Sequence, residues 1–74
     1  MMREHDAVVL TRDIPEHGLR AGDVGAVVHV HVPGRAFEVE FVAGDGRTVA
    51  VLTLESGDVR AVTETEIFHV RAFS

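Results

Sequence analysis

Residues 18–42, GLRAGDVGAVVHVHVPGRAFEVEFV, decide the fold. Apolar and polar residues alternate along 26–32 and again along 36–42, which is the period-two pattern of half-buried strands. Between these runs, Pro33 fixes φ at about −65° and Gly34 accepts a positive φ, so the pair suits the centre of a type II turn. The stretch therefore predicts an antiparallel β-hairpin.

The register of this hairpin assigns each side chain to a face of the sheet. A tight turn at Pro33-Gly34 pairs Val28 with Val39 and His29 with Glu38. Since neighbouring residues on a strand point to opposite faces, the pattern predicts one core face and one solvent face. The core face is expected to hold Val28, Val30, Phe37, Val39 and Phe41, and the solvent face His29, His31, Glu38 and Glu40.

Further β-forming runs flank this hairpin at 6–11, 48–54 and 59–62. The Asp-Gly dipeptide within 43–47 predicts a second hairpin leading into the run at 48–54. That run is almost uninterrupted in apolar residues, so we expect it in the middle of the sheet rather than at an edge.

The C-terminal segment allows two interpretations. Thr63-x-x-Glu66 matches a capping box that could open a helix. However, Ile67, Phe68 and Val70 are weak helix formers, and only a short helix could follow. We therefore expect an extended sixth strand at 66–71.

A long ordered loop is expected at 11–25, because a proline and three glycines are spaced too closely for a helix. Ile14 and Leu19 should anchor this loop by reaching into the core. These elements predict an all-β fold, a small antiparallel SH3-like barrel of five to six strands with a long loop after the first strand. One domain should span 1–74, with its core in 6–62 and a C-terminal extended strand within 63–72.

Composition narrows the functional classes. The chain has 74 residues, a net charge of −5 and no cysteine, and its basic residues are scattered single arginines. Binding to nucleic acid is unlikely without a clustered basic patch. No run approaches the ~20 apolar residues of a membrane helix, so we expect a cytoplasmic protein without membrane contact.

Residues 13–54, DIPEHGLRAGDVGAVVHVHVPGRAFEVEFVAGDGRTVAVLTL, resemble a family of small bacterial proteins known only as a domain of unknown function. The resemblance is carried by Pro15, Gly18, Leu19, Gly22, Gly25, Glu38, Phe41, Thr53 and Leu54. It implies an SH3-like barrel and no established activity. Members are sometimes encoded beside toxin-like or nuclease-associated genes, which suggests an antitoxin or immunity role. The segment DVGAVVHV also resembles, more loosely, KOW-type RNA-binding barrels, although those usually carry more lysine and arginine.

Catalytic and metal sites have weak support. His29, His31 and Glu38 could approach one another on a sheet face, but zinc needs further ligands at fixed geometry. Glu16 and His17 are adjacent in the loop, yet no nucleophile accompanies them. We expect no enzyme activity, no cofactor and no metal.

The leading hypothesis is a non-catalytic protein-protein interaction module, such as an antitoxin or immunity-type accessory protein. Its partner would be a basic protein, bound in a groove between the long loop and the 43–47 hairpin or along a strand edge. A KOW-like nucleic-acid binder and a self-associating structural domain, dimeric through 66–71, are the alternatives. The expected contact residues are Ile14, Glu16, His17, Leu19, His29, His31, Glu38 and Glu40.

Overall fold

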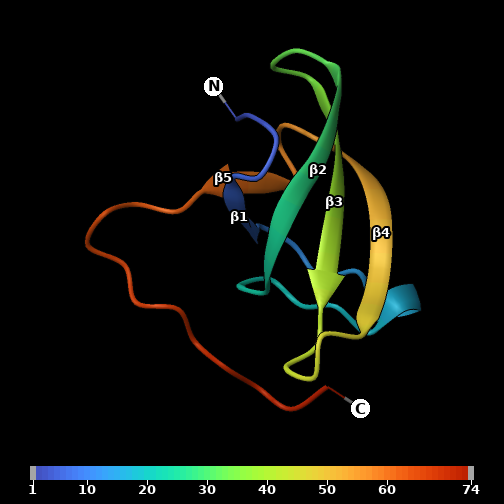
Figure 1. The fold of residues 1–74 in the computed structure, drawn as a ribbon, viewed down its shortest axis with the longest axis vertical. Coiled ribbons are helices and arrows are strands. Elements are labelled where there is room, and N and C mark those ends of the chain that lie inside the picture. The colour runs from blue at the N-terminus through green and yellow to red at the C-terminus, as the bar shows by residue number, and fades with distance from the viewer. Residues whose placement is uncertain (1, 74) are drawn as a thin grey trace.

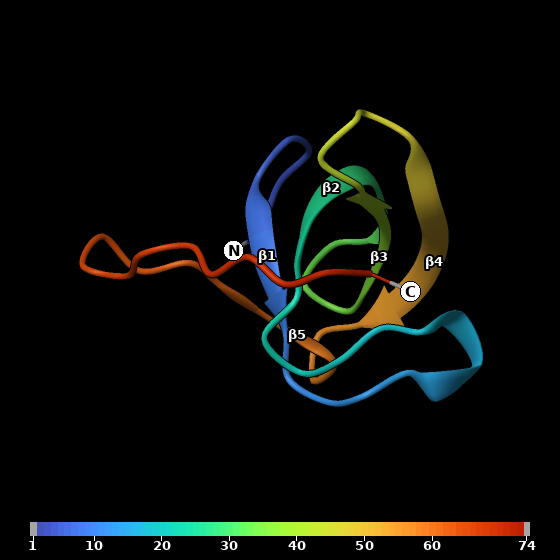
Figure 2. The same cartoon turned by 90° about the horizontal axis from the view of Figure 1, so that it is seen from below.

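The computed structural model describes residues 2–73, which form one antiparallel sheet of five strands in the order β4-β3-β2-β1-β5. The strands are β1 (Ala7–Leu10), β2 (Val24–Val32), β3 (Ala36–Val42), β4 (Thr48–Glu55) and β5 (Val59–Ala61). The sheet is strongly curled, as Figures 1 and 2 show from two directions. This confirms the all-β prediction and is consistent with a small barrel-like fold. Nowhere in residues 2–73 is there a helix with the length and apolarity needed to cross a bilayer.

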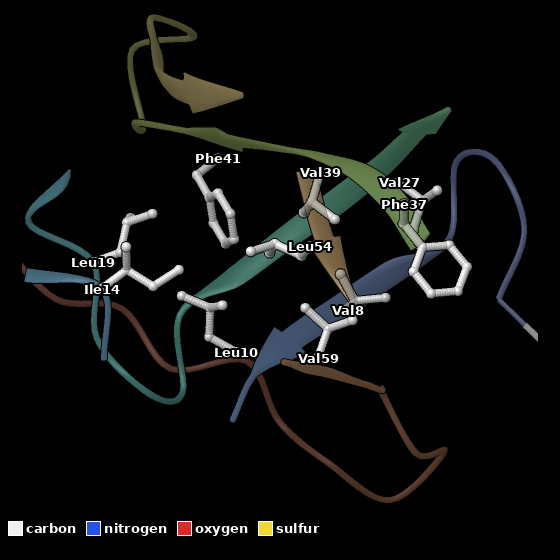
Figure 3. Packing of buried hydrophobic residues seen from close by; sticks show 10 residues of the cluster. All are labelled: Val8, Leu10, Ile14, Leu19, Val27, Phe37, Val39, Phe41, Leu54 and Val59. Atoms are coloured by element: carbon white, nitrogen blue, oxygen red, sulfur yellow. The ribbon is translucent and has the colours of Figure 1, made fainter. Parts of the chain in front are cut away.

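The core lies inside the curl of the sheet and is built from aliphatic residues and two phenylalanines (Figure 3). Val8, Val27, Phe37 and Val39 are completely shielded from solvent. The other members are Leu10, Ile14, Leu19, Phe41, Leu54 and Val59. Every strand contributes, so the sheet is stabilised mainly by burial of its inner face.

The turn between β2 and β3 forms as expected. The amide of Arg35 donates to the carbonyl of Val32 at 2.9 Å, which closes a four-residue turn around Pro33-Gly34. Gly34 has φ 74°, the positive value that a type II turn requires at its third residue.

The register predicted for this hairpin is right in its middle, at His29 and Val30, and wrong on both sides. Next to the turn, a register shift between Val30 and Val32 pairs Val32 with Ala36. His29 lies opposite Glu38 as expected, but Val39 is paired with Val27 and not with Val28. A β-bulge between Val27 and His29 adds one residue to β2, so all positions before it change face. Val27 is therefore buried, and Val28 is 40% exposed instead of lying in the core.

The long loop after β1 is fixed by the two apolar residues that the sequence indicated. Ile14 and Leu19 are each only 4% exposed, and they form an isolated antiparallel bridge. Between them Pro15–His17 forms one turn of 3₁₀ helix, η1, that was not expected. Gly18 ends this turn in the left-handed conformation, with φ 69°.

Strand β4 lies at an edge of the sheet, and its expected central position is wrong. It pairs only with β3. Its apolar run reflects the inner face instead: Leu54 is buried and Val49, Ala50 and Leu52 pack against the core, whereas Val51 points outward. The only charged residue of β4 is its last one, so the free edge carries almost no charge.

The sixth strand predicted at 66–71 is absent, because residues 62–73 contain neither strand nor helix. Thr63 and Glu66 instead form a single turn: Glu66 N donates to Thr63 O at 3.1 Å, and Thr63 N donates to Glu66 Oε1 at 2.8 Å. Both carboxylate oxygens of Glu66 also accept hydrogen bonds from Arg60, at 2.8 and 2.6 Å. These bonds hold the capping-box turn in place, but no helix follows it. We call the segment 62–73 the tail; it runs outward and returns across one end of the curled sheet (Figures 1 and 2).

The bulge predicts unequal effects of two neighbouring substitutions. Val27→Ala removes buried methyl groups and should lower the free energy of unfolding by about 1.5–3 kcal/mol. Val28→Ala changes an exposed side chain and should cost less than about 0.5 kcal/mol. Urea denaturation of both variants measures the difference. Equal losses, or a larger loss at Val28, would contradict the bulge.

Gly25 predicts a second pair of variants. A Cβ at this position would lie 2.7 Å from Val39 Cγ1 and 2.8 Å from Phe41 Cε1, so Gly25→Ala forces the inner side chains apart. We expect it to reduce the free energy of unfolding by about 1–3 kcal/mol. Gly44→Ala is the control, since a Cβ there meets nothing within 4 Å and its φ is not positive. If the melting temperature fell equally in both variants, the close packing of β2 against β3 at Gly25 would be contradicted.

Candidate functional site

A groove lies at the end of the sheet that the tail crosses. It has a volume of about 340 Å³ and lies where the sequence placed a groove, between the long loop and the β3–β4 hairpin. Its wall on the sheet side is mostly apolar and comprises Leu19, Val24, Phe41, Val42 and Val49, and its wall on the tail side comprises Phe68, His69, Val70, Arg71 and Phe73. We call it the tail groove.

The tip of the tail is held in place by one arginine. Arg71 donates from Nε to Asp23 Oδ1 at 2.8 Å and from Nη2 to Asp23 Oδ2 at 2.6 Å. Nη2 also donates to the carbonyl oxygen of Gly18 at 2.8 Å. This bidentate geometry is the strongest arrangement for an arginine and a carboxylate. The ring of Phe73 lies against Gly18, where a Cβ would be only 3.0 Å from Cε1 of the ring.

Asp23 is positioned by contacts that do not involve the tail. Its backbone N–H donates to the carbonyl of Arg20 at 3.0 Å, and its carbonyl accepts from the amide of Leu10 in β1 at 2.9 Å. Its Oδ2 also accepts from the backbone amide of Arg20 at 2.8 Å. The carboxylate is therefore oriented by the loop itself.

The charge of Asp23 is stabilised by the same contacts. The hydrogen bonds from Arg71, and to a smaller degree the Arg20 amide, lower the pKa of Asp23, although partial burial opposes the shift. At the other end of the tail, the hydrogen bonds from Arg60 lower the pKa of Glu66 to about 2. The tail thus has two anchors, each an arginine paired with a carboxylate that stays ionised well into the acid range.

Between these anchors and just beyond the second, the tail exposes large apolar side chains. Ile67 is 93% exposed and Val70 87%, and Phe68 and Phe73 are about half exposed. Val42, at the rim of the groove, is 50% exposed. Apolar side chains gathered in this way are typical of a surface that binds another molecule.

A polar surface, separate from the tail groove, lies on the outer face of β2 and β3. His31 Nε2 and Glu38 Oε2 are 2.6 Å apart, and the rings of His29 and His31 meet edge to face with centroids 4.7 Å apart. The expected cross-strand contact of His29 with Glu38 is not made by the side chains; His29 Nδ1 lies instead 3.7 Å from Glu4 Oε2. Glu40 accepts a hydrogen bond from Thr48 Oγ1 at 2.7 Å. We call Glu4, His29, His31, Glu38 and Glu40 the acidic face.

The predicted contact residues fall into three separate groups. His29, His31, Glu38 and Glu40 do share one face, as expected. Ile14 and Leu19 are both buried in the core; Ile14 is thereby removed from the accessible contacts, whereas Leu19 still lines the wall of the tail groove. Glu16 and His17 are exposed on η1, at the end of the molecule away from the β2–β3 turn (Figure 1).

Metal binding gains no support from the positions of the acidic and histidine side chains. Across residues 2–73 no three of them converge in an arrangement that could hold an ion.

Sequence reasoning missed the residues that organise the tail groove, chiefly Asp23 and Arg71. They are 48 positions apart and lie in segments without periodicity, so no local pattern connects them. The apolar residues of the tail were a visible signal, but they were interpreted as part of a sixth strand.

Comparison with known proteins identifies a family and nothing more specific. Residues 4–61 match the family model described as "Domain of unknown function (DUF4926)", which covers all five strands and ends before the tail. No curated protein and no solved structure matches the chain.

Acid should release the tip of the tail. Because the pKa of Asp23 is lower in the folded protein, its stabilising contribution is complete above the ordinary value of 3.8 and is lost as the pH falls through the lowered value. The NMR resonances of the Gly18 amide and the Phe73 ring should therefore shift with a midpoint below 3.8. Asp23→Asn is the control, and should show the shifted resonances already at neutral pH. A midpoint at or above the ordinary value would contradict the ion pair.

Proposed function

Since the chain belongs to the DUF4926 family, a domain of unknown function, we propose its function from its own surface: a non-catalytic module that binds a basic protein. The observation that carries this proposal is the tail groove, an apolar hollow whose rim and cover leave large apolar side chains in solvent. Exposing Val42, Phe68, Val70 and Phe73 has a free-energy cost that a bound partner would remove.

Charge supports a basic partner. The chain has a net charge of −5, and within residues 2–73 no arginine forms an ion pair with Glu4, Glu38 or Glu40. Uncompensated carboxylates on one face would accelerate association with a positively charged protein and would set its orientation. The acidic face therefore complements the apolar groove, which would supply most of the affinity.

We further propose that the fold is SH3-like and that the protein works in the cytoplasm of a bacterium. The strand order β4-β3-β2-β1-β5 and the long loop after β1 support the first point, and the absence of cysteine is in keeping with the second. An antitoxin or immunity role fits this picture, since such a module would cover the functional surface of a basic protein.

The alternatives have less support. A KOW-like nucleic-acid binder would need a basic surface, and this chain is acidic. A dimer through a strand at 66–71 lacks its expected element, because that segment is not a strand.

Two exposed valines test whether the groove is the binding surface. We expect tagged Val42→Asn protein to lose at least about tenfold in affinity for the partner that the unsubstituted chain captures from native extract, because an apolar contact of ~1.4 kcal/mol is removed. Val51→Asn is the matched control: Val51 is 47% exposed, close to the 50% of Val42, but it faces away from the groove. Equal capture by both variants, or no stoichiometric partner of the intact chain, would refute the proposal.

A further inference from the structure

The tail groove contains a receptor for an arginine side chain, and the tail of the chain itself shows how it is used. Outside the tail, three acceptor atoms contact the guanidinium group: the two carboxylate oxygens of Asp23 and the carbonyl oxygen of Gly18. A fourth acceptor, the carbonyl oxygen of Ala72, belongs to the tail itself. A guanidinium presents its N–H groups in a fixed planar fork that matches such a set, whereas an ammonium cannot bind in the same bidentate manner. The side chain of Arg71 is 25% exposed and that of Asp23 is 16% exposed, so the contact is largely shielded from water.

The acceptors of this receptor are oriented by contacts that do not involve the tail. Asp23 is held by backbone bonds to Leu10 and Arg20, and its carboxylate already accepts from the Arg20 amide. Gly18 presents its carbonyl at the left-handed end of η1, a conformation that is fixed by the hydrogen bond from Gly18 N to Pro15 O. Preorganised acceptors bind a guanidinium with little loss of their own freedom.

The tail, in contrast, uses little of its own backbone and apolar surface in the site. Apart from the turn at Thr63 and Glu66, its described backbone makes no hydrogen bond to another backbone group. Ile67 and Val70 remain almost fully exposed, so much of the apolar surface of the tail gains nothing from docking. A segment from another protein that also buried its apolar side chains in the groove would bind the same receptor better.

We propose that the tail groove recognises an extended segment of a basic partner protein in which an arginine is followed two residues later by phenylalanine. The arginine would take the position of Arg71 between Asp23 and Gly18, and the phenylalanine that of Phe73 against Gly18. In the free protein the tail occupies the positions that this segment would take. The inference rests on the proposed interaction function, but it specifies the chemistry of the partner, which that function does not.

Arginine recognition can be measured directly with the full-length Arg71→Ala protein, in which the receptor is vacated and the core is unchanged. The probe is a fluorescent peptide of residues 67–73, IFHVRAF, followed by anisotropy. Two control peptides have lysine or alanine in place of the arginine and are otherwise identical. We expect the arginine peptide to bind at least about tenfold more tightly than either, because a charge-assisted bidentate contact is lost in both. Unsubstituted protein should bind it more weakly, since its own tail competes.

The double variant Asp23→Asn/Arg71→Ala tests the carboxylate. It should lose the preference for arginine while keeping the same dispersed NMR spectrum as Arg71→Ala. Equal binding of the three peptides by Arg71→Ala, or an unchanged arginine preference in the double variant, would overturn the proposal. So would a wild-type dimer that becomes monomeric in Arg71→Ala, because the arginine would then come from a second copy of the chain.

The peptide-binding experiment and the partner-capture experiment test the two proposals independently. If capture of a partner depends on Val42 but no peptide shows an arginine preference, the interaction module stands and the arginine receptor is refuted. If arginine-dependent binding is measured but no protein is captured, the receptor exists without the proposed partner, and both the basic partner and the interaction function are refuted.

Discussion

The close approach of β2 to the inner side chains of β3 is the constraint on which this small fold depends. At Gly25 the backbone lies so near Val39 and Phe41 that a single methyl group would collide with both. This proximity lets short strands curl around a core that contains no tryptophan or tyrosine. A larger residue would separate β2 from the core and open the curl. The position two residues earlier is Asp23, so the junction that allows the sheet to bend also places the carboxylate of the tail groove.

Local sequence patterns were enough to predict most of the sheet. The alternation along 36–42 corresponds to β3, with the same bounds. Pro33-Gly34 forms the turn that its two residues favour, and Ile14 with Leu19 fixes the long loop because both large apolar side chains are buried in the core. In each case, the physical cause acts within a few residues.

The errors share a different cause, which is that the outcome depends on distant partners. The bulge at Val28 is set by how β2 meets both β1 and β3, and the alternating pattern carries no sign of it. The apolar run of β4 could not distinguish a central strand from an edge strand that packs on the core. In the tail, Arg60 and Arg71 each pair with a carboxylate, and these contacts direct the segment across the end of the sheet and not along a strand edge. Part of the acidic face was predictable, because it follows from strand alternation, but Asp23 and Arg71 were not.

The free side of β4 has a consequence for the behaviour of the protein in solution. A strand of eight residues with one terminal charge presents unpaired amides and carbonyls that a second copy could continue. The overall negative charge opposes association of two copies, and it vanishes near the isoelectric pH of about 5.4. Mild acidification should therefore favour sheets that grow from molecule to molecule through β4, while the interior of each molecule remains folded.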